Sequence, residues 1–300
     1  MQVWNRTRAW WTAGVLWLLA GMAQAAPLSI LLTNDDGYDA PGLAALRAAL
    51  TAAGHRVTVV APLHQQSGSG VRLSLGELAL AARGPAEWTV DGSPADSAAI
   101  GLARVMADAR PDLVVSGANL GQNLGANVVS SGTVGAAVMA VQLGVPAIAV
   151  SVGLDLAEAK ATPTPFPSTT AAYPLAGRIL VRLVETLAEH AEGGPLLPPD
   201  TLLNLNVPAL PAARLAGLVL APLGSHGGFR LAYAAGAAGQ VRSSLTIDAA
   251  GVADAAADTG RYADGYVTLS VLRPDWNATP AQSAGLAARL GDPAALLSPP

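Results

Sequence analysis

Two aspartates stand side by side where an apolar segment of the sequence ends. Asp35 and Asp36 follow the run LSILLT (residues 28–33) after a single asparagine and precede Gly37. Adjacent carboxylates repel each other and are costly to hold in a partly buried site, and a divalent cation removes that cost by neutralising both. The loops nearby in the predicted fold offer serines and asparagines, so the doublet indicates Mg²⁺, Mn²⁺ or Ca²⁺ rather than zinc. Taken alone, NDDG is also typical of a surface turn.

Two later loops carry the other polar groups that such a site needs. Serines occur in QSGSG (66–70) and asparagines in SGANLGQN (116–123). The second loop runs on into SGT (131–133), where a helix is predicted to begin, and helix N-termini with glycine-rich backbone attract phosphate. A cation beside such an anion-binding backbone is an arrangement that can hydrolyse a phosphate ester. A flexible glycine-rich loop is the alternative interpretation of residues 116–132 in isolation.

The elements predicted around these loops explain how the loops can meet. Apolar runs and turn signals predict strands at 28–33, 56–62, 112–117 and 145–152, helices at 41–54, 91–106 and 133–144, and a hairpin within 73–90. A helix at 171–192 and strands at 202–208, 215–223 and 265–272 follow. This alternation predicts an α/β fold with a mostly parallel sheet. Because open sheets bind ligands outside the carboxyl ends of their strands, we expect the three polar loops to converge at one edge.

Composition narrows the class of protein. The chain has 300 residues, of which 51% are hydrophobic and 13% charged, as is typical of a globular protein. The formal charge of −4 argues against a nucleic-acid polymer as partner. The sequence contains no cysteine, which excludes disulfides, thiolate metal ligands and cysteine nucleophiles. Neither GxGxxG after the first strand nor GxxxxGK[ST] occurs, so the common dinucleotide and P-loop motifs are excluded as well.

The N-terminus has the pattern of a secretory signal peptide. Arg6 and Arg8 precede an uncharged run at residues 9–22, and Ala23-Gln24-Ala25 supplies the small residues of a cleavage point. A membrane anchor is the alternative, but this run is shorter than the roughly 20 residues needed to span a bilayer. We therefore predict a periplasmic or secreted protein without stable membrane insertion. Its predicted parts are a signal peptide at 1–25, an α/β phosphatase domain at 26–277 and a C-terminal tail at 278–300.

Several motifs together resemble one known family. NDDG (34–37), QSGSG (66–70), SGANLGQN (116–123) and SGTVGAA (131–137) occur in the order seen in the SurE survival-protein family of metal-dependent nucleotide phosphatases. DGSPADS, NLNVP and DGYVTLSVL extend the resemblance over nearly the whole chain after the predicted signal peptide. Each motif is weak alone, but the set is specific. The chain departs from the family at Ser130, where an aromatic residue or proline is frequent, and in its predicted export, since the family is mostly cytoplasmic.

The resemblance implies a fold, an assembly and a set of site residues. The implied fold is a Rossmann-like, mostly parallel sheet flanked by helices, with a C-terminal β-hairpin extension that is swapped in a homodimer or homotetramer. The implied ligands of a divalent cation are Asp35, Asp36, Ser67 and Asn119. The implied phosphate contacts are Ser131, Gly132 and Thr133, with Asn123 as a further phosphate contact or a residue supporting the site. The implied substrates are nucleoside monophosphates, with polyphosphate accepted by some members.

The function predicted from these features is metal-dependent hydrolysis of nucleoside monophosphates to nucleoside and phosphate. Water is the expected nucleophile, with Asp36 the preferred aspartate for proton transfer. A covalent aspartyl-phosphate is the second choice, because a carboxylate that ligates a metal is a poor nucleophile. An exported nucleotide- or phosphate-binding protein without turnover is the alternative from another class, and a nucleoside hydrolase is a third. The histidines His64 and His226 are interpreted as solvated or hydrogen-bonded loop residues.

Overall fold

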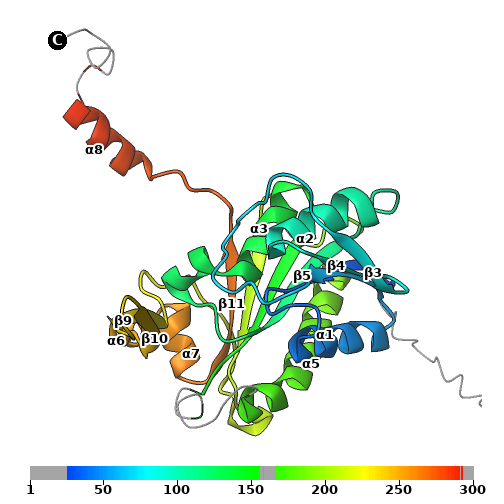
Figure 1. The fold of residues 1–300 in the computed structure, drawn as a ribbon, viewed down its shortest axis with the longest axis horizontal. Coiled ribbons are helices and arrows are strands. Elements are labelled where there is room, and N and C mark those ends of the chain that lie inside the picture. The colour runs from blue at the N-terminus through cyan, green and yellow to red at the C-terminus, as the bar shows by residue number, and fades with distance from the viewer. Residues whose placement is uncertain (1–25, 156–157, 159–165, 291, 293–300) are drawn as a thin grey trace, which may run out of the picture.

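The fold is built on one large sheet. The computed structural model describes residues 26–155, 158, 166–290 and 292 of the chain, so the predicted signal peptide lies outside the described residues. Nine strands form the sheet in the order β3-β4-β2-β1-β5-β6-β7-β11-β8 (Figure 1). Six neighbouring strands are parallel: β4 (Glu87–Val90), β2 (Arg56–Pro62), β1 (Ser29–Thr33), β5 (Leu113–Leu120), β6 (Ala147–Val152) and β7 (Leu202–Val207). The predicted α/β class with a mostly parallel sheet is therefore confirmed.

The edges of the sheet hold the remaining strands. β3 (Leu80–Gly84) is antiparallel to β4 and makes the predicted hairpin with it. At the other edge β11 (Tyr266–Leu272) runs antiparallel to β7, and β8 (Gly217–Leu220) runs parallel to β11. The sheet thus keeps its parallel strands in the middle, where both faces are covered and continuous apolar runs are buried.

Helices cover both faces of the sheet, and β1 shows how the sequence arranges this. Successive side chains of a strand point to opposite faces. Ile30 and Leu32 belong to one buried cluster together with side chains of α1 (Pro41–Ala52) and α5 (Pro167–His190). Leu31 belongs to the other, with side chains of α3 (Gly132–Gln142). The helix α2 (Pro94–Ile100), continued by the π-helix η1 (Gly101–Val105), packs beside α3 (Figure 1).

The strand β5 is longer than the sequence predicted, and the predicted loop after it is correspondingly shorter. The strand was expected to end at residue 117, but it pairs with β6 as far as Leu120. The register shifts between Ser116 and Asn119, and the Gly117–Ala118 peptide bond is cis. The short 3₁₀ helix η2 (Gly125–Ser130) then leads into α3. Asn119 therefore sits on a strand rather than on a mobile loop.

The C-terminal third adds elements outside the main layers. β9 (Phe229–Ala235) and β10 (Val241–Ile247) form an antiparallel hairpin, which agrees with the hairpin extension implied by the family resemblance. The short helices in this region are η3 (Ala212–Arg214), α6 (Ala249–Ala253) and α7 (Asp258–Ala263). The tail forms a helix, α8 (Pro280–Leu290), which stands away from the body (Figure 1). Within the described residues, no helix has the length and apolar character needed to cross a bilayer.

Candidate metal and phosphate site

The two aspartates lie just beyond the carboxyl end of β1, and each is held by a different neighbouring element. Asp35 is almost completely buried, at 2% exposure, and its Oδ1 accepts a 2.7 Å hydrogen bond from the Thr133 hydroxyl at the start of α3. Asp36 is half-buried, and its Oδ2 accepts a 2.8 Å hydrogen bond from the backbone N–H of Leu120 at the end of β5. The aspartates therefore do not sit in a surface turn, because β5 and α3 fix their orientation.

Burial and mutual repulsion leave this pair poorly stabilised as two anions. Burial raises the pKa of Asp35 above its ordinary value, although the Thr133 hydrogen bond opposes the shift. Burial, followed by the charge of Asp35, raises the pKa of Asp36 to about 7, against the lowering effect of the Leu120 N–H. A positively charged ligand between the two carboxylates would favour their ionised forms and so offset both causes of the shift. The electrostatics therefore fit a cation site.

Asn119 supplies a further candidate ligand oxygen for a cation, in addition to the two carboxylates. Its side chain is buried, and its Nδ2 donates to the Gly121 carbonyl at 2.6 Å. Its Oδ1 is buried and has no hydrogen-bond partner among the described residues. An unsatisfied buried carbonyl oxygen costs about 1–3 kcal/mol, so it needs a water or a cation. Within the described parts of the chain no three His, Cys, Asp or Glu side chains come together, so the donor set here is carboxylate and amide oxygen, which suits a hard cation.

Ser67 lies at the rim of the same region on the segment that follows β2. The backbone N–H of Gln66 donates to the Asp35 carbonyl at 2.6 Å, which ties this segment to the end of β1. The Ser67 side chain is exposed, and its Oγ accepts from the Gln65 amide at 2.7 Å. A hydroxyl oxygen retains a second lone pair for a further partner. The position suits an outer ligand that completes the site from the solvent side.

The N-terminus of α3 meets the aspartates at close range. Ser131 caps this helix, with its Oγ accepting from the Val134 N–H at 3.1 Å. A Cβ on Gly132 would lie 2.8 Å from the Asp35 Cβ and 2.7 Å from the Ser69 hydroxyl, so only glycine permits this approach. The positive end of the helix dipole therefore lies beside the carboxylates, where it would favour an anion held by a cation.

Asn123 is held in place mainly by polar residues of β6 and β7. Its Nδ2 donates to Ser151 at 3.0 Å and, more weakly, to Thr133 at 3.4 Å. Its backbone N–H donates to Asn206 at 2.7 Å, and its carbonyl accepts from Asn204 and Asn206. These contacts fix the loop after β5 against the sheet. They favour a positioning role for Asn123, next to the residue that bonds to Asp35.

One cavity of about 430 Å³ joins most of these groups. The predicted site residues that line it are Asp35, Ser67, Asn119, Asn123 and Ser131. The other three predicted residues do not line the cavity but contact residues that do. Asp36 is bonded to Leu120, Thr133 is bonded to Asp35, and Gly132 packs against Asp35. The structure thus brings all eight predicted residues into one region at the carboxyl edge of the sheet.

Comparisons with known proteins test the family resemblance seen in the sequence motifs. A family model described as survival protein SurE matches residues 30–227. The chain belongs to the SurE family. It is 41% identical over 200 residues to 5'-nucleotidase SurE 1 of Burkholderia lata, covering 66% of this chain and 71% of that protein. It is 40% identical over 194 residues to 5'-nucleotidase SurE of Geobacter metallireducens, covering 64% and 69%. The crystal structure of the SurE protein from Aquifex aeolicus matches with a TM-score of 0.70 and 30% identity, covering 88% of this chain and all of that one.

The SurE match ends at Gly227, just before residues that the sequence interpretation missed. Phe229 and Leu231 of β9 line the cavity, as do Leu154 after β6 and the amides Gln122 and Asn127. The available signal for Phe229 was its rarity, since the chain contains two phenylalanines. The two histidines behave as interpreted: the His64 side chain is exposed, and His226 lies 3.9 Å from Asp248.

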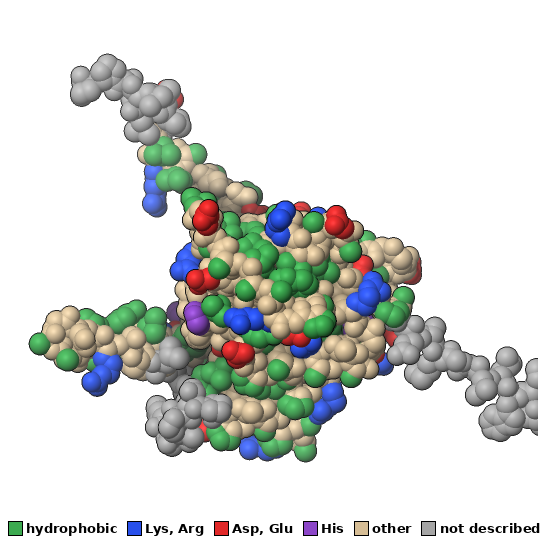
Figure 2. All heavy atoms as spheres, turned by 45° about the vertical axis from the view of Figure 1, so that its right-hand side comes forward, with side chains coloured by type: hydrophobic (Ala, Val, Ile, Leu, Met, Phe, Trp, Pro, Cys, Tyr) green, Lys and Arg blue, Asp and Glu red, His purple; other side chains and the backbone are tan. Residues whose placement is uncertain are grey.

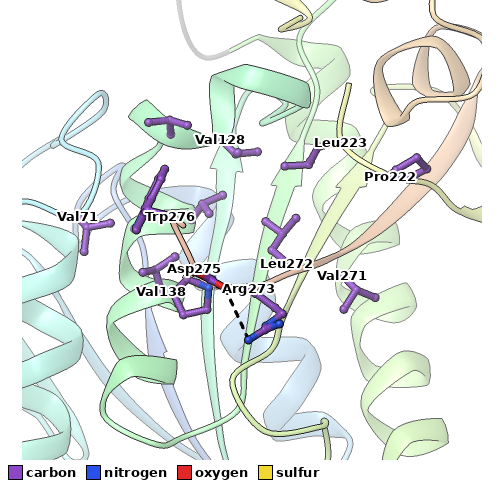
Figure 3. A pocket seen from close by; sticks show the side chains of 14 residues that line it. Val71, Val128, Val138, Pro222, Leu223, Val271, Leu272, Arg273, Asp275 and Trp276 are labelled. Carbon is purple, nitrogen blue, oxygen red and sulfur yellow. Dashed lines mark ion pairs between the residues drawn. The ribbon is translucent and has the colours of Figure 1, made fainter. Parts of the chain in front are cut away.

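A second hollow, of about 400 Å³, is apolar and lies between η2, α3 and the end of β11 (Figure 3). Its charged side chains are Arg273 and Asp275, which lie 3.9 Å apart, and the exposed side chain of Trp276 also lines it. None of the eight predicted site residues lines it. The predicted site residues therefore gather at the cavity of about 430 Å³ and not at this hollow.

Proposed function

We propose that this chain is a divalent-cation-dependent 5'-nucleotidase that hydrolyses nucleoside monophosphates to nucleoside and phosphate. The observation that carries the proposal is the adjacent carboxylate pair in one region with an unpartnered buried amide oxygen, Asn119 Oδ1, beside the N-terminus of α3. Relatives about 40% identical, which bear the name 5'-nucleotidase, support the substrate class. On the face seen in Figure 2, acidic and basic side chains are interspersed, which supports a small substrate rather than a nucleic-acid polymer.

Asp35, Asp36, Asn119 and Ser67 would hold the cation, which we propose is Mg²⁺, Mn²⁺ or Ca²⁺. When bound, the cation neutralises the carboxylates and polarises a phosphoryl oxygen. The protein fixes the orientation of the two carboxylates. The Thr133 hydroxyl and the Leu120 N–H each hold one carboxylate, so neither has to reorganise when the substrate arrives.

The start of α3 is the proposed phosphate-binding element. The first-turn backbone N–H groups of Gly132 and Thr133 and the Ser131 hydroxyl lie at the positive end of an 11-residue helix. The Ser131 N–H is already bonded to a carbonyl of η2, and the Thr133 hydroxyl holds Asp35. Donors that are fixed before the reaction stabilise charge as it develops on the phosphoryl group. Asn123 supports this element through its bond to Thr133.

Proton transfer from the attacking water is assigned to the aspartate pair. Coupled carboxylates titrate as a unit. Asp35 lines the cavity, and its Oδ1 is held as an acceptor by the Thr133 hydroxyl. Asp36 is the less buried of the two, and its one side-chain hydrogen bond to the described residues is from the Leu120 N–H. We keep Asp36 as the preferred final acceptor. A binding protein without turnover is the alternative function, since the same groups would bind a nucleotide tightly.

Phosphate release tests the proposal and separates it from the alternative. The substrates are AMP, GMP, 3'-AMP and polyphosphate, each with Mn²⁺ or Mg²⁺ and with EDTA. The variants are Asp36→Asn and, as a matched control, Asp39→Asn, which removes an exposed carboxylate from the same segment. We expect metal-dependent release from AMP that Asp36→Asn abolishes and Asp39→Asn retains. Nucleotide binding without release from any substrate would instead make the chain a binding protein.

Assembly and export are further parts of the proposal. Large apolar side chains of β8 and β10 are exposed (Leu218, Leu220 and Val241), and an open edge with apolar groups suits pairing with another copy in a dimer or tetramer. Light scattering after size exclusion tests this, and a monomer would contradict it. Export rests on the N-terminal pattern at residues 1–25. Recovery of an uncleaved chain from the cytosol would contradict it.

A further inference from the structure

The cavity lined by the polar site residues is also lined by large apolar side chains. Phe229 and Leu231 are two residues apart on β9, so their side chains point to the same face of the strand. Both line the cavity, together with Leu154 from the segment after β6. Among the described residues of the lining, Asp35 alone carries a formal charge. The lining therefore combines polar groups suited to a phosphate with apolar side chains suited to a neutral group.

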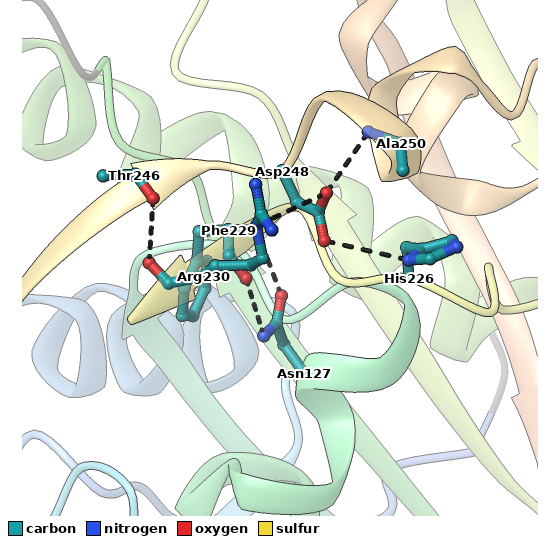
Figure 4. A network of polar contacts seen from close by, with 7 residues as sticks. All are labelled: Asn127, His226, Phe229, Arg230, Thr246, Asp248 and Ala250. Carbon is teal, nitrogen blue, oxygen red and sulfur yellow. Dashed lines mark hydrogen bonds and ion pairs between the residues drawn. The ribbon is translucent and has the colours of Figure 1, made fainter. Parts of the chain in front are cut away.

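Phe229 is held at a fixed place relative to the phosphate-binding loop. The Asn127 amide donates to the Phe229 carbonyl at 3.1 Å and accepts from the Phe229 N–H at 3.3 Å (Figure 4). Asn127 belongs to η2, the 3₁₀ helix that leads directly into α3. The hairpin is thereby attached at its root to the element that carries the proposed phosphate contacts.

A buried carboxylate, Asp248, contacts the base of the β9–β10 hairpin from the side of β10. Asp248, at 6% exposure, follows β10 and lies 3.7 Å from the Arg230 guanidinium and 3.9 Å from the His226 ring (Figure 4). It also accepts from the Ala250 N–H at 3.2 Å. The two ion pairs are long and their basic partners are exposed, so the two amide bonds from η2 are the main contacts that hold the Phe229 backbone before any ligand binds. A preorganised aromatic side chain costs little entropy when a ligand packs against it.

We propose that Phe229, with Leu231 and Leu154, forms the subsite for the nucleoside part of the substrate, with the base stacked on the Phe229 ring. This inference rests on the proposed function and adds the residues that recognise the leaving group. A cavity of about 430 Å³ falls within the usual size of small-molecule sites. The chain has two phenylalanines in 300 residues, so composition alone does not explain an aromatic ring at this place. Leu231 is 55% exposed, which leaves apolar surface for a ligand to cover.

Stacking sets the chemical class of substrate that the subsite accepts. Every base has an aromatic face, so stacking tolerates any of them. The Asn127 amide is bonded to the Phe229 backbone at both ends, which fixes its orientation. The subsite therefore favours nucleoside monophosphates as a class over sugar phosphates that lack a base.

Kinetics with matched substrates test the subsite in the full chain. AMP and ribose 5-phosphate share the phosphate and the sugar and differ by the base. We expect Phe229→Ala to lower kcat/KM for AMP roughly tenfold and to leave ribose 5-phosphate within about twofold. Phe229→Trp should retain activity on AMP. Tyr233→Ala is the control, because Tyr233 shares the strand face with Phe229, is exposed and lies outside the cavity lining. Equal losses on both substrates, or no loss on AMP, would overturn the proposal.

A binding measurement without turnover keeps the subsite separate from the enzyme function. Saturation-transfer NMR with adenosine and metal-free protein should show transfer to the adenine protons for the wild type and Tyr233→Ala, and none for Phe229→Ala. Wild-type protein that binds adenosine through Phe229 but releases no phosphate from AMP would refute the proposed function and leave the subsite standing. Hydrolysis of AMP that Phe229→Ala does not change, with unchanged adenosine transfer, would refute the subsite and leave the function standing.

Discussion

Asp36→Asn should make the metal-free protein more resistant to unfolding at neutral pH than the wild type. Burial and the charge of Asp35 raise the pKa of Asp36 from 3.8 to about 7 in the folded state. The stability that a protonated Asp36 contributes is therefore fully present below about pH 4 and is lost as the pH rises through about 7. Asparagine carries no charge, and its Oδ1 can still accept the Leu120 N–H bond, which is 2.8 Å in the wild type.

The size of the effect follows from the two pKa values. Because Asp36 ionises at lower pH in the unfolded chain than in the folded one, the wild type loses about 2 kcal/mol of stability by about pH 5 and about 4 kcal/mol by about pH 8, relative to acid pH. The excess of the free energy of unfolding of Asp36→Asn over that of the wild type should therefore grow by about 2 to 3 kcal/mol between the lower and the higher pH. This is an upper bound, since Asp35 titrates together with Asp36. Other titrating groups are shared by both proteins and cancel.

Urea unfolding in EDTA at the two pH values measures this difference. Asp39→Asn is the control, because it removes one exposed carboxylate from the same segment and should show no such pH dependence. Adding Mn²⁺ at the higher pH should stabilise the wild type by about 3 kcal/mol at a hundredfold excess over Kd, and Asp36→Asn by much less. An unchanged difference between wild type and Asp36→Asn at the two pH values would refute the account of the carboxylate pair.

Three further substitutions test other parts of the site. Asn119→Leu removes the unpartnered oxygen and should weaken Mn²⁺ binding at least tenfold in an EPR titration, whereas unchanged affinity would exclude it as a ligand. Gly132→Ala places a Cβ 2.8 Å from that of Asp35 and should cost about 1–3 kcal/mol in urea unfolding, with kcat/KM for AMP falling more than tenfold. Thr133→Val removes a bond that lowers the pKa of Asp35, so the acid limb of the kcat/KM profile should move to higher pH; a shift to lower pH would contradict this.

The position of the aspartates was predictable from the sequence because local signals and fold class agree there. An apolar strand followed by polar residues recurs at 28–37, 56–70 and 112–123, and the carboxyl ends of parallel strands share one edge. The structure places β1, β2 and β5 side by side, and the three loops meet as predicted. Alternating strands and helices were equally clear, since each has its own period of apolar residues.

Other features depend on tertiary contacts that no local pattern carries. Residues 118–120 contain Ala, Asn and Leu after a glycine and look like a loop, but pairing with β6 extends β5 through them. The hairpin strands β9 and β10 bury few side chains, so they lack the clean alternation that marks a half-buried strand. Phe229 reaches the cavity through its bonds to Asn127, which is about 100 positions earlier in the chain. The helix α8 lies within the predicted C-terminal tail, for which no helix was predicted, and alanine-rich sequence favours helix even without packing.

The central claim is that Asp35, Asp36 and Asn119 hold a cation beside the start of α3. Anomalous diffraction from crystals grown with Mn²⁺ and phosphate tests it most directly. We predict one anomalous peak about 2 to 2.5 Å from oxygen atoms of these three side chains, with the phosphate against residues 131–133. A manganese peak elsewhere, or phosphate bound at a distance from α3 with the aspartates empty, would contradict the account.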